Sequence, residues 1–373
     1  MAYYDVISSE SLYTMHSRGS VTSFEALYIS DKSVTGVSRW STPHLYASRV
    51  ICAKPDKRLA IFSDDEWPQS TRGVHECIDS LIDGPIPGFR GMFESQIVQH
   101  YRHHHQADGL GYVWAALARL LQAELQAVDL TTDRTMRDRR PPVQHQDYVS
   151  SESMQVGSSP PAASMSGSTS SVSSLNWVDN LSSAPLEGLT LRLASCFIRC
   201  VINYAQSADK LHPVHFRDEH LANVFQPIAG LSVEAIDDGG LQLQAEGQTV
   251  QVATIEGKRA FQEFTSEGIP TVSDKTLAQL VGQALARRRD VKIKSIQQDD
   301  HISILVVTRY VKFFHFNITN DFIAKYEKPA PETDYLRVSS TLWFDLARQG
   351  HREKVVEHIL AILTWAEKHR AHR

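Results

Sequence analysis

The sequence predicts an α/β fold in which a central mixed sheet is flanked by helices. From residue 186 onward, an apolar helical stretch is followed by strand-like segments, a second helix, a hairpin and further helices. This order is typical of a sheet covered by helices. Hydrophobic residues make up 42% and charged residues 22% of the chain, a composition that supplies enough apolar side chains for a sizeable core.

The 373 residues suit one large or two medium domains. A Ser/Pro/Gly-rich stretch divides the chain, and such a segment buries too little apolar surface to offset its ordering entropy. We therefore predict three parts: a mainly helical N-terminal part over 1–130, a disordered linker over 131–185, and an α/β domain with C-terminal helices over 186–373.

In the N-terminal part, Ser63 to Glu66 has the pattern of a capping box with acidic residues in the first turn. The helix that it opens should end at Asp83-Gly84. Its predicted buried face contains Val74, Cys77, Ile78, Leu81 and Ile82. Further helices are predicted over 93–101 and 112–128, and short strands over 45–52 and 59–62.

In the C-terminal part, the first predicted element is an apolar helix over 189–205. Strands are predicted over 214–216, 231–236, 241–245 and 250–258. A helix over 275–287 follows, with Ser273 as its N-cap. The remaining predictions are a hairpin of strands 302–308 and 311–318, and two helices over 340–349 and 352–369.

Carboxylates and a lysine are predicted to meet at the end of one strand. Because strand side chains alternate, Glu256 and Lys258 should share a face, together with Val250, Val252 and Thr254. The turn Asp237-Asp238-Gly239-Gly240 precedes the neighbouring strand, and a hairpin would bring Asp238 beside them. Two carboxylates suit a hard cation such as Mg²⁺, and a nearby ammonium can steady an attacking water or a developing negative charge.

With these residues the sequence resembles the PD-(D/E)XK nuclease superfamily, in which an acid at one strand is followed by Glu-x-Lys on the next. Asp238 matches the first acid, and Glu256-Gly257-Lys258 matches the second element. The predicted helix and strand that follow agree with the order of elements in the superfamily. The phrases DDGG, IEGKR and LAQLVGQALA also resemble a group of poorly characterised fungal proteins with nuclease-like domains. The resemblance covers Leu186 to Ile318, roughly a third of the chain.

The resemblance implies a Mg²⁺- or Mn²⁺-dependent nuclease that hydrolyses phosphodiester bonds in DNA or RNA. Asp238 and Glu256 would bind the metal, with Asp237 as a substitute ligand. Lys258 would position the water and stabilise the transition state, and Gln279 would orient the site. The run Arg287, Arg288 and Arg289 would hold the nucleic-acid backbone.

The superfamily often takes a further glutamate from its first helix. The predicted helix over 189–205 contains none, and Glu187 lies just before it. A non-catalytic interaction protein built on a degenerate nuclease-like fold therefore stays open as the alternative. In that hypothesis the N-terminal part or the linker binds a protein partner. The missing glutamate and the net charge of -5 favour it, whereas the intact Asp…Glu-x-Lys pattern favours the nuclease.

Each motif also has a purely structural explanation. Glu256 and Lys258 would form an ordinary ion pair on a solvated strand face, worth little stability. Asp237 to Gly240 would be a simple turn. The Arg287 to Arg289 run would complement the negative end of the helix dipole.

The sequence argues against zinc proteases, serine hydrolases, P-loop proteins and dinucleotide-binding proteins. It contains no HExxH, G-x-S-x-G, phosphate-binding Gly-Lys-Ser/Thr or G-x-G-x-x-G motif. The N-terminus lacks the basic stretch and apolar run of a secretory signal, and no segment is apolar enough to span a bilayer. Four cysteines do not suggest a disulfide scaffold, and Cys196 and Cys200 are interpreted as buried free thiols. We therefore expect an intracellular protein of the cytoplasm or nucleus, with no membrane contact.

Overall fold

The computed structural model of the chain describes residues 2–17, 23–30, 36–105, 108–132, 186–228, 231–290, 292–326 and 334–370. The predicted linker over 131–185 lies outside these ranges, apart from residues 131 and 132. Those two residues end the long helix α7 (Asp108–Thr132).

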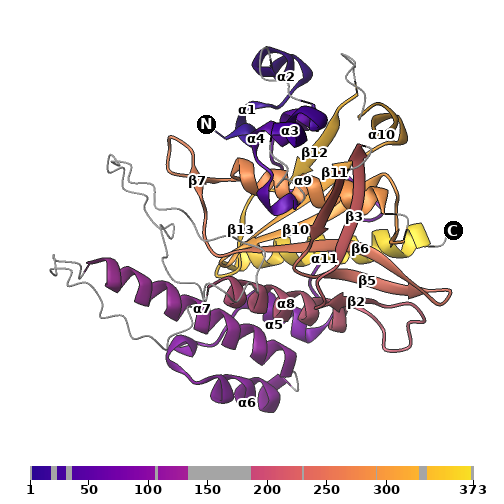
Figure 1. Cartoon of the computed structure of the whole chain (residues 1–373). Helices are drawn as coiled ribbons and strands as arrows, with labels where there is room; N and C mark the ends of the chain where they lie inside the picture. Colours follow the sequence, from indigo (N-terminus) through magenta and orange to yellow (C-terminus); the bar gives the residue numbers. More distant parts are fainter. Residues whose placement is uncertain are drawn as a thin grey trace, which may run out of the picture.

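Within the described residues nine strands form one mixed sheet, which confirms the predicted α/β class (Figure 1), and the remaining strands form two separate pairs. Its central strand β6 (Gln248–Lys258) pairs parallel with β10 (Asp300–Val307) and antiparallel with β5 (Gly240–Ala245). The strand order is β1 (Val50–Cys52), β12 (Leu336–Ser340), β11 (Tyr310–Asn317), β10, β6, β5 and β2 (Val214–Arg217). Two short strands lie off this path: β9 (Lys294–Ser295) pairs with β6, and β13 (Phe344–Asp345) pairs with β11.

Helices cover both faces of the sheet (Figure 1). The first face carries α5 (Glu76–Asp83), α6 (Glu94–His105), α7, α8 (Leu186–Ala205) and α11 (Gln349–Arg370). The second carries α9 (Asp274–Arg289), the N-terminal helices and a separate hairpin of β3 (Ala222–Ile228) and β4 (Leu231–Ile236). The remaining elements on this side are α1 (Tyr3–Val6), α2 (Glu10–Ser17), α3 (Phe24–Ser30), η1 (Val37–Arg39), α4 (Thr42–Ala47) and α10 (Asn320–Tyr326).

Side-chain alternation along the strands divides the apolar core into two layers. On β11, Phe313 belongs to the cluster beneath α8 and α11, whereas Phe314 and Phe316 belong to the cluster beneath α9. On β10, Val306 and Leu305 divide in the same way. Burial on both faces explains why apolar residues occur at both odd and even positions of these strands.

Of the elements predicted in the N-terminal part, the helices match the structure better than the strands, whereas α1, α2 and α3 were not predicted. The helix expected from Ser63 begins only at Glu76, because Pro68 and Gly73 interrupt the intervening chain and His75 is the N-cap. Of the predicted buried face, Val74 is exposed and the other four residues are buried. The strand predicted over 45–52 is helix α4 followed by the short β1, and 59–62 is a turn rather than a strand.

In the C-terminal part, the predicted helix over 340–349 is wrong. Ser340 belongs to β12 and pairs with β11, and the buried residues Phe344 and Leu346 are two apart, as in extended chain. The strands β3 and β12 were not predicted. Pro227 argued against a strand at β3, because proline is normally confined to edge strands or bulges. In the structure β3 has a register irregularity between Phe225 and Ile228, on either side of this proline. The strand predicted over 231–236 has these same ends in the structure, and the other predicted elements occur with shifted ends.

A β-bulge in β6 overturns one prediction about strand faces. Pairing with β5 shifts register between Leu241 and Gln242, which leaves Val252 as the extra residue of β6. As a result Val250 and Val252 lie in the cluster beneath α8, whereas Glu256 contacts α9 on the opposite face. The predicted grouping of the two valines with Glu256 is therefore wrong.

The N-terminal segment packs closely on α9 at Gly282. A Cβ atom at this glycine would lie 2.6 Å from Val37 Cγ1 and 3.0 Å from Trp40 Cε3. The Tyr3 N–H also donates to Asp274 Oδ1 (2.6 Å) at the start of α9, and Thr42 Oγ1 donates to Asp274 Oδ2 (2.5 Å). The position of α9 thus depends on residues near the N-terminus of the chain.

Gly282→Ala is expected to destabilise the protein by about 1–3 kcal/mol, because the added methyl overpacks a fixed contact. Gly350→Ala in α11 is the matched control, since nothing lies within 4 Å of a Cβ atom there. The control should not be destabilising, since alanine is favoured over glycine in helices by at most about 1 kcal/mol and Gly350 is the second residue of α11. Urea denaturation of both variants measures the difference, and equal shifts in the same direction would contradict the contact.

Candidate active site

The turn between β4 and β5 places Asp238 against the end of β6. Gly239 has φ of 144°, a conformation that residues with a Cβ rarely adopt. The Asp238 N–H donates to Ile255 O (3.1 Å), and the Ile255 N–H donates to Gly239 O (2.9 Å). The predicted hairpin therefore continues into the turn. The Gly257 N–H then donates to Asp238 Oδ2 (2.9 Å), which fixes the carboxylate beside the Glu-x-Lys segment.

The carboxylate of Glu256 is buried between β6 and α9, with only 1% of the residue exposed. Its Oε1 accepts from Lys258 Nζ (2.5 Å) and from Gln279 Nε2 (2.7 Å), and its Oε2 accepts from Gln283 Nε2 (2.7 Å). The same Gln283 nitrogen also donates to the backbone oxygen of Ile236 (2.9 Å), and Ile236 is the residue before Asp237. Gln279 thus lies where it was predicted, and Gln283 is an additional residue of the site.

Charges of both signs are coupled across this cluster. Burial raises the pKa of Glu256 more than the Lys258 charge lowers it, and the Asp238 charge raises it further. Burial likewise raises the pKa of Asp238. Burial lowers the pKa of Lys258, but the Glu256 and Asp238 carboxylates outweigh burial, so the pKa of this ammonium is raised overall. The Lys258 ammonium thus does not fully offset the effect of burial on the pKa values of the two carboxylates.

Glu187 is a third carboxylate near the site, and its helix placement was predicted incorrectly. Helix α8 begins at Leu186, so Glu187 lies within its first turn rather than before it. Its charge raises the pKa values of both Asp238 and Lys258. A Cβ at Gly257 would meet Leu191 Cδ2 at 2.7 Å, so α8 lies directly against this part of β6. Glu187 and Leu191 are four positions apart and so share one face of the helix, a spacing that was visible in the sequence.

His220 is a further residue that the sequence did not single out. Its Nδ1 lies 2.8 Å from Asp237 O and 3.7 Å from Asp238 Oδ1, and its side chain is 59% exposed. Asp238 and Lys258 have side chains that are only 6% and 12% exposed. The side of the cluster that carries His220 is therefore open to solvent, whereas the side that carries Glu256 is closed.

Asp237, the predicted substitute ligand, is directed elsewhere. Its Oδ2 accepts from Arg217 Nη2 (2.7 Å), and both side chains are 2% exposed. Its Oδ1 accepts from the Leu221 N–H (3.0 Å). Burial raises the pKa of Asp237 despite this ion pair. The structure brings Asp238, Glu256, Lys258 and Gln279 together but leaves the Asp237 carboxylate bound to Arg217.

The three arginines at the end of α9 each have partners within the protein, and the burial of Arg287 argues against its predicted role in holding a phosphate backbone. Arg287 is buried, its Nε donates to Ser295 Oγ (3.0 Å), and burial lowers its pKa to about 10. Arg288 donates to Asp299 Oδ1 (3.0 Å), and Arg289 donates to Gln226 O (3.1 Å). These contacts connect the end of α9 to neighbouring segments of the chain.

The residues at the cluster are chemically suited to a hard divalent cation. Asp238 and Glu256 offer oxygen donors. Burial is the main cause of their raised pKa values, and a bound cation would stabilise the ionised carboxylates. Across the described part of the chain, no three acidic, histidine or cysteine side chains lie together as metal ligands. Two carboxylates are nevertheless a usual protein contribution for Mg²⁺, which keeps several waters and binds substrate phosphate.

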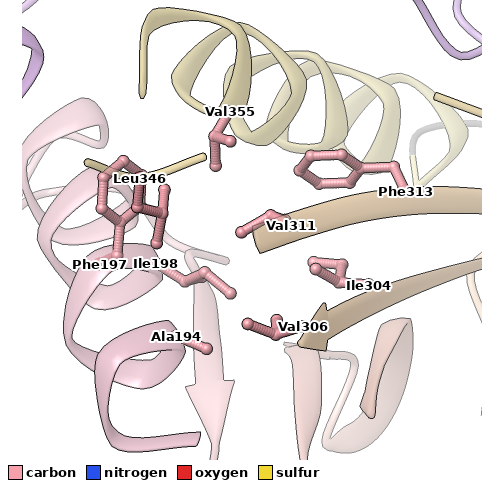
Figure 2. A pocket seen from close by; sticks show the side chains of 9 residues that line it. All are labelled: Ala194, Phe197, Ile198, Ile304, Val306, Val311, Phe313, Leu346 and Val355. Atoms are coloured by element: carbon pink, nitrogen blue, oxygen red, sulfur yellow. The ribbon is translucent and has the colours of Figure 1, made fainter. Parts of the chain in front are cut away.

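A small apolar cavity lies on the opposite face of the sheet from Glu256. Figure 2 shows side chains of α8, β10, β11 and α11 around it, with Ala194, Val306 and Val355 on three sides. Its volume of about 10 Å³ and its wholly apolar lining leave it too small and too dry for a ligand. This cavity is a packing defect and carries no chemistry.

Comparisons of the chain with protein-family models, curated proteins and solved structures found no match. No helix in the described ranges is both long and apolar enough to cross a bilayer. Any assignment of activity therefore rests on the geometry of the chain itself.

Lys258→Met is expected to destabilise the protein by roughly 3–5 kcal/mol at neutral pH, because it leaves the Glu256 carboxylate buried without its counter-charge. The loss should shrink as the pH falls. The variant raises the pKa of Glu256 further, and the folded state then takes up a proton that the unfolded chain binds only near its ordinary pKa of 4.5. Denaturant unfolding at several pH values measures both effects.

Lys354→Met is the matched control, since Lys354 pairs with Glu357 (2.8 Å) with its own side chain 40% exposed. It should cost no more than about 1 kcal/mol, and its cost should not change comparably with pH. If the two lysine variants lose equal stability, Glu256 does not depend on Lys258 as the contacts indicate.

Proposed function

We propose that the chain is a Mg²⁺- or Mn²⁺-dependent nuclease that hydrolyses phosphodiester bonds at the Asp238–Glu256–Lys258 cluster. One observation carries the proposal: two carboxylates and an ammonium from the turn and from β6 meet at the end of the central strand. The Glu187 charge acts on the same groups. Such an excess of carboxylates around one lysine suits the binding of a divalent cation and an anionic substrate.

A bound metal ion would lower the pKa of a coordinated water and offset charge on the scissile phosphate. Asp238 and Glu256 are the residues that would hold it. Lys258, whose side chain is 12% exposed beside Glu256, is the group that would face the phosphate and stabilise the developing negative charge. Gln279 and Gln283 would keep the Glu256 carboxylate in one orientation by donating to its two oxygens.

The resemblance to the PD-(D/E)XK superfamily supports the same proposal. Asp238 precedes β5, Glu256-Gly257-Lys258 ends β6, α9 follows, and β10 pairs with β6. Glu187 lies in the first turn of α8 and would be the acidic residue whose absence favoured a degenerate fold. Substrate would approach from the side of His220, where the cluster is open to solvent.

The alternative is a non-catalytic interaction protein, and a specific observation favours it. Three N–H donors already occupy the two oxygens of Glu256, which is 1% exposed. A carboxylate whose two oxygens both accept hydrogen bonds from the protein can hold α9 on the sheet without binding a metal ion. In this hypothesis the network is structural, and partners bind to other surfaces of the chain.

Cleavage assays decide between the two functions. Plasmid DNA, single-stranded DNA and structured RNA would be incubated with the full chain and Mg²⁺ or Mn²⁺. We expect metal-dependent cleavage that Glu256→Gln and Lys258→Ala each reduce by about 10²-fold or more, the usual effect of removing one stabilising group. Glu357→Gln, at the surface pair with Lys354, is the control and should cut normally. Absence of cleavage by correctly folded wild type would favour the interaction protein.

Metal binding can be measured without any substrate. Saturating Mn²⁺, at about 100 times its dissociation constant, should stabilise the wild type by roughly 2.7 kcal/mol. Asp238→Asn should abolish this increase in the unfolding temperature. Asp237→Asn should retain it despite a lower starting stability, because the Asp237 carboxylate is bound to Arg217. An identical metal response in wild type and Asp238→Asn would exclude the proposed ligand.

A further inference from the structure

A serine, a histidine and an aspartate lie side by side on three neighbouring strands, away from the Glu256 cluster. Asp300 is on β10, His315 is on β11 and Ser339 is on β12. His315 and Ser339 are direct cross-strand partners, and Asp300 is paired with Asn317, two residues along β11 from His315. Since Phe314 and Phe316 lie in the core beneath α9, His315 lies on the opposite face of the sheet from Glu256.

The hydrogen bonds assign a role to each atom of the imidazole. His315 Nε2 lies 2.7 Å from Asp300 Oδ1, and an ionised carboxylate only accepts, so Nε2 carries the proton. Nδ1 of neutral His315 is then the acceptor, and it lies 3.4 Å from Ser339 Oγ. The serine hydroxyl is therefore the donor in this contact. This is the arrangement of a nucleophile, a general base and an orienting acid.

The acid is itself held in place. Asn317 Nδ2 donates to Asp300 Oδ1 (3.0 Å), the same oxygen that binds His315. Burial raises the pKa of Asp300, but the hydrogen bonds from His315 and Asn317 together lower it by more. The pKa of Asp300 is therefore below its usual value. Asp300 thus stays ionised at neutral pH. The side chains of His315 and Asp300 are 13% and 28% exposed, and Ser339 is also partly exposed, so a small reagent can reach the cluster.

We propose that Ser339, His315 and Asp300 form a second reactive site, in which Ser339 is a nucleophile toward small acyl esters. In the first step Ser339 Oγ bonds to the acyl carbon and His315 Nδ1 accepts the hydroxyl proton. The ester bond between the acyl carbon and the alkoxy oxygen then breaks, and the proton passes from His315 to that oxygen, which leaves as the alcohol. In the second step water attacks the acyl-serine, His315 takes a proton from that water, and Ser339 is released with its proton restored. Carboxylic acid and alcohol are the products.

The expected rate is modest. General-base assistance contributes about 10²–10⁴-fold over an unassisted hydroxyl. The strand β12 that carries Ser339 pairs with β11 on one side and β1 on the other. Its backbone N–H groups are thus largely engaged in the sheet rather than available to a developing oxyanion. We therefore expect Ser339 to be acylated in a rapid first turnover and released slowly. This site is independent of the proposed nuclease function.

The experiment uses the full chain, a fluorophosphonate ester as the trapping probe and p-nitrophenyl acetate as the substrate. In trapping, the Ser339 Oγ–P bond forms as the P–F bond breaks, His315 takes the proton and fluoride leaves. We expect one adduct per chain, mapped to Ser339 by digestion and mass measurement, and a burst of p-nitrophenol close to one equivalent. Ser339→Ala should lose both, and His315→Gln and Asp300→Asn should each slow labelling at least tenfold.

Ser70→Ala is the control, because Ser70 is exposed and bonded only to nearby backbone, and labelling of this variant should equal that of wild type. Unfolding temperatures establish that each variant is folded. If His315→Gln does not fold, the mapped adduct, Ser339→Ala and Asp300→Asn decide. An adduct at another residue, labelling that survives Ser339→Ala, or equal rates in wild type and the folded His315 or Asp300 variants would overturn the proposal. Absence of any adduct would also overturn it.

Discussion

The buried carboxylate of Glu256 constrains the arrangement of everything around it. An ionised carboxylate that is 1% exposed is costly unless several donors replace its lost water. Lys258 supplies one donor from the same strand, and Gln279 and Gln283 supply two more from α9. Because Gln283 also binds Ile236 O, the strand, the helix and the turn that presents Asp238 meet at one point. The geometry of the candidate site follows from satisfying this single charge.

The same requirement gives the N-terminal part of the chain a structural role. Helix α9 must hold both glutamines at the correct depth, and its other side is fixed by the close contact of Gly282 with Val37 and Trp40. Its first residue, Asp274, accepts from Tyr3 and Thr42. The segment Val50–Cys52 also adds the edge strand β1 to the sheet. The described residues before the predicted linker are thus part of the same core as those after it.

The sequence was sufficient to predict the class of fold and the central residues of the candidate site. Apolar periodicity identified α8, α9 and the β10–β11 hairpin, and strand alternation placed Glu256 beside Lys258. What it missed depends on distant contacts. The bulge at Val252 exists only in the pairing with β5, and it moves two valines to the other face. The helical start that includes Glu187 was obscured by the low-complexity segment before it. The burial of Arg287 and the pairing of Asp237 with Arg217 arise from tertiary packing that local charge patterns do not report.

The close approach of Gly257 to Leu191 means that the middle residue of Glu-Gly-Lys is not a neutral spacer. A Cβ there would lie 2.7 Å from Leu191 Cδ2 and 2.8 Å from its Cγ, so the two positions share one volume. A larger side chain on the strand can be accommodated only by a smaller one on α8, or by moving the helix and with it Glu187. The two positions should therefore vary as a compensating pair during evolution, with the size of one limiting the size of the other. Residues 191 and 257 together would therefore set the distance between α8 and β6. That distance determines how close Glu187 lies to Asp238 and Lys258.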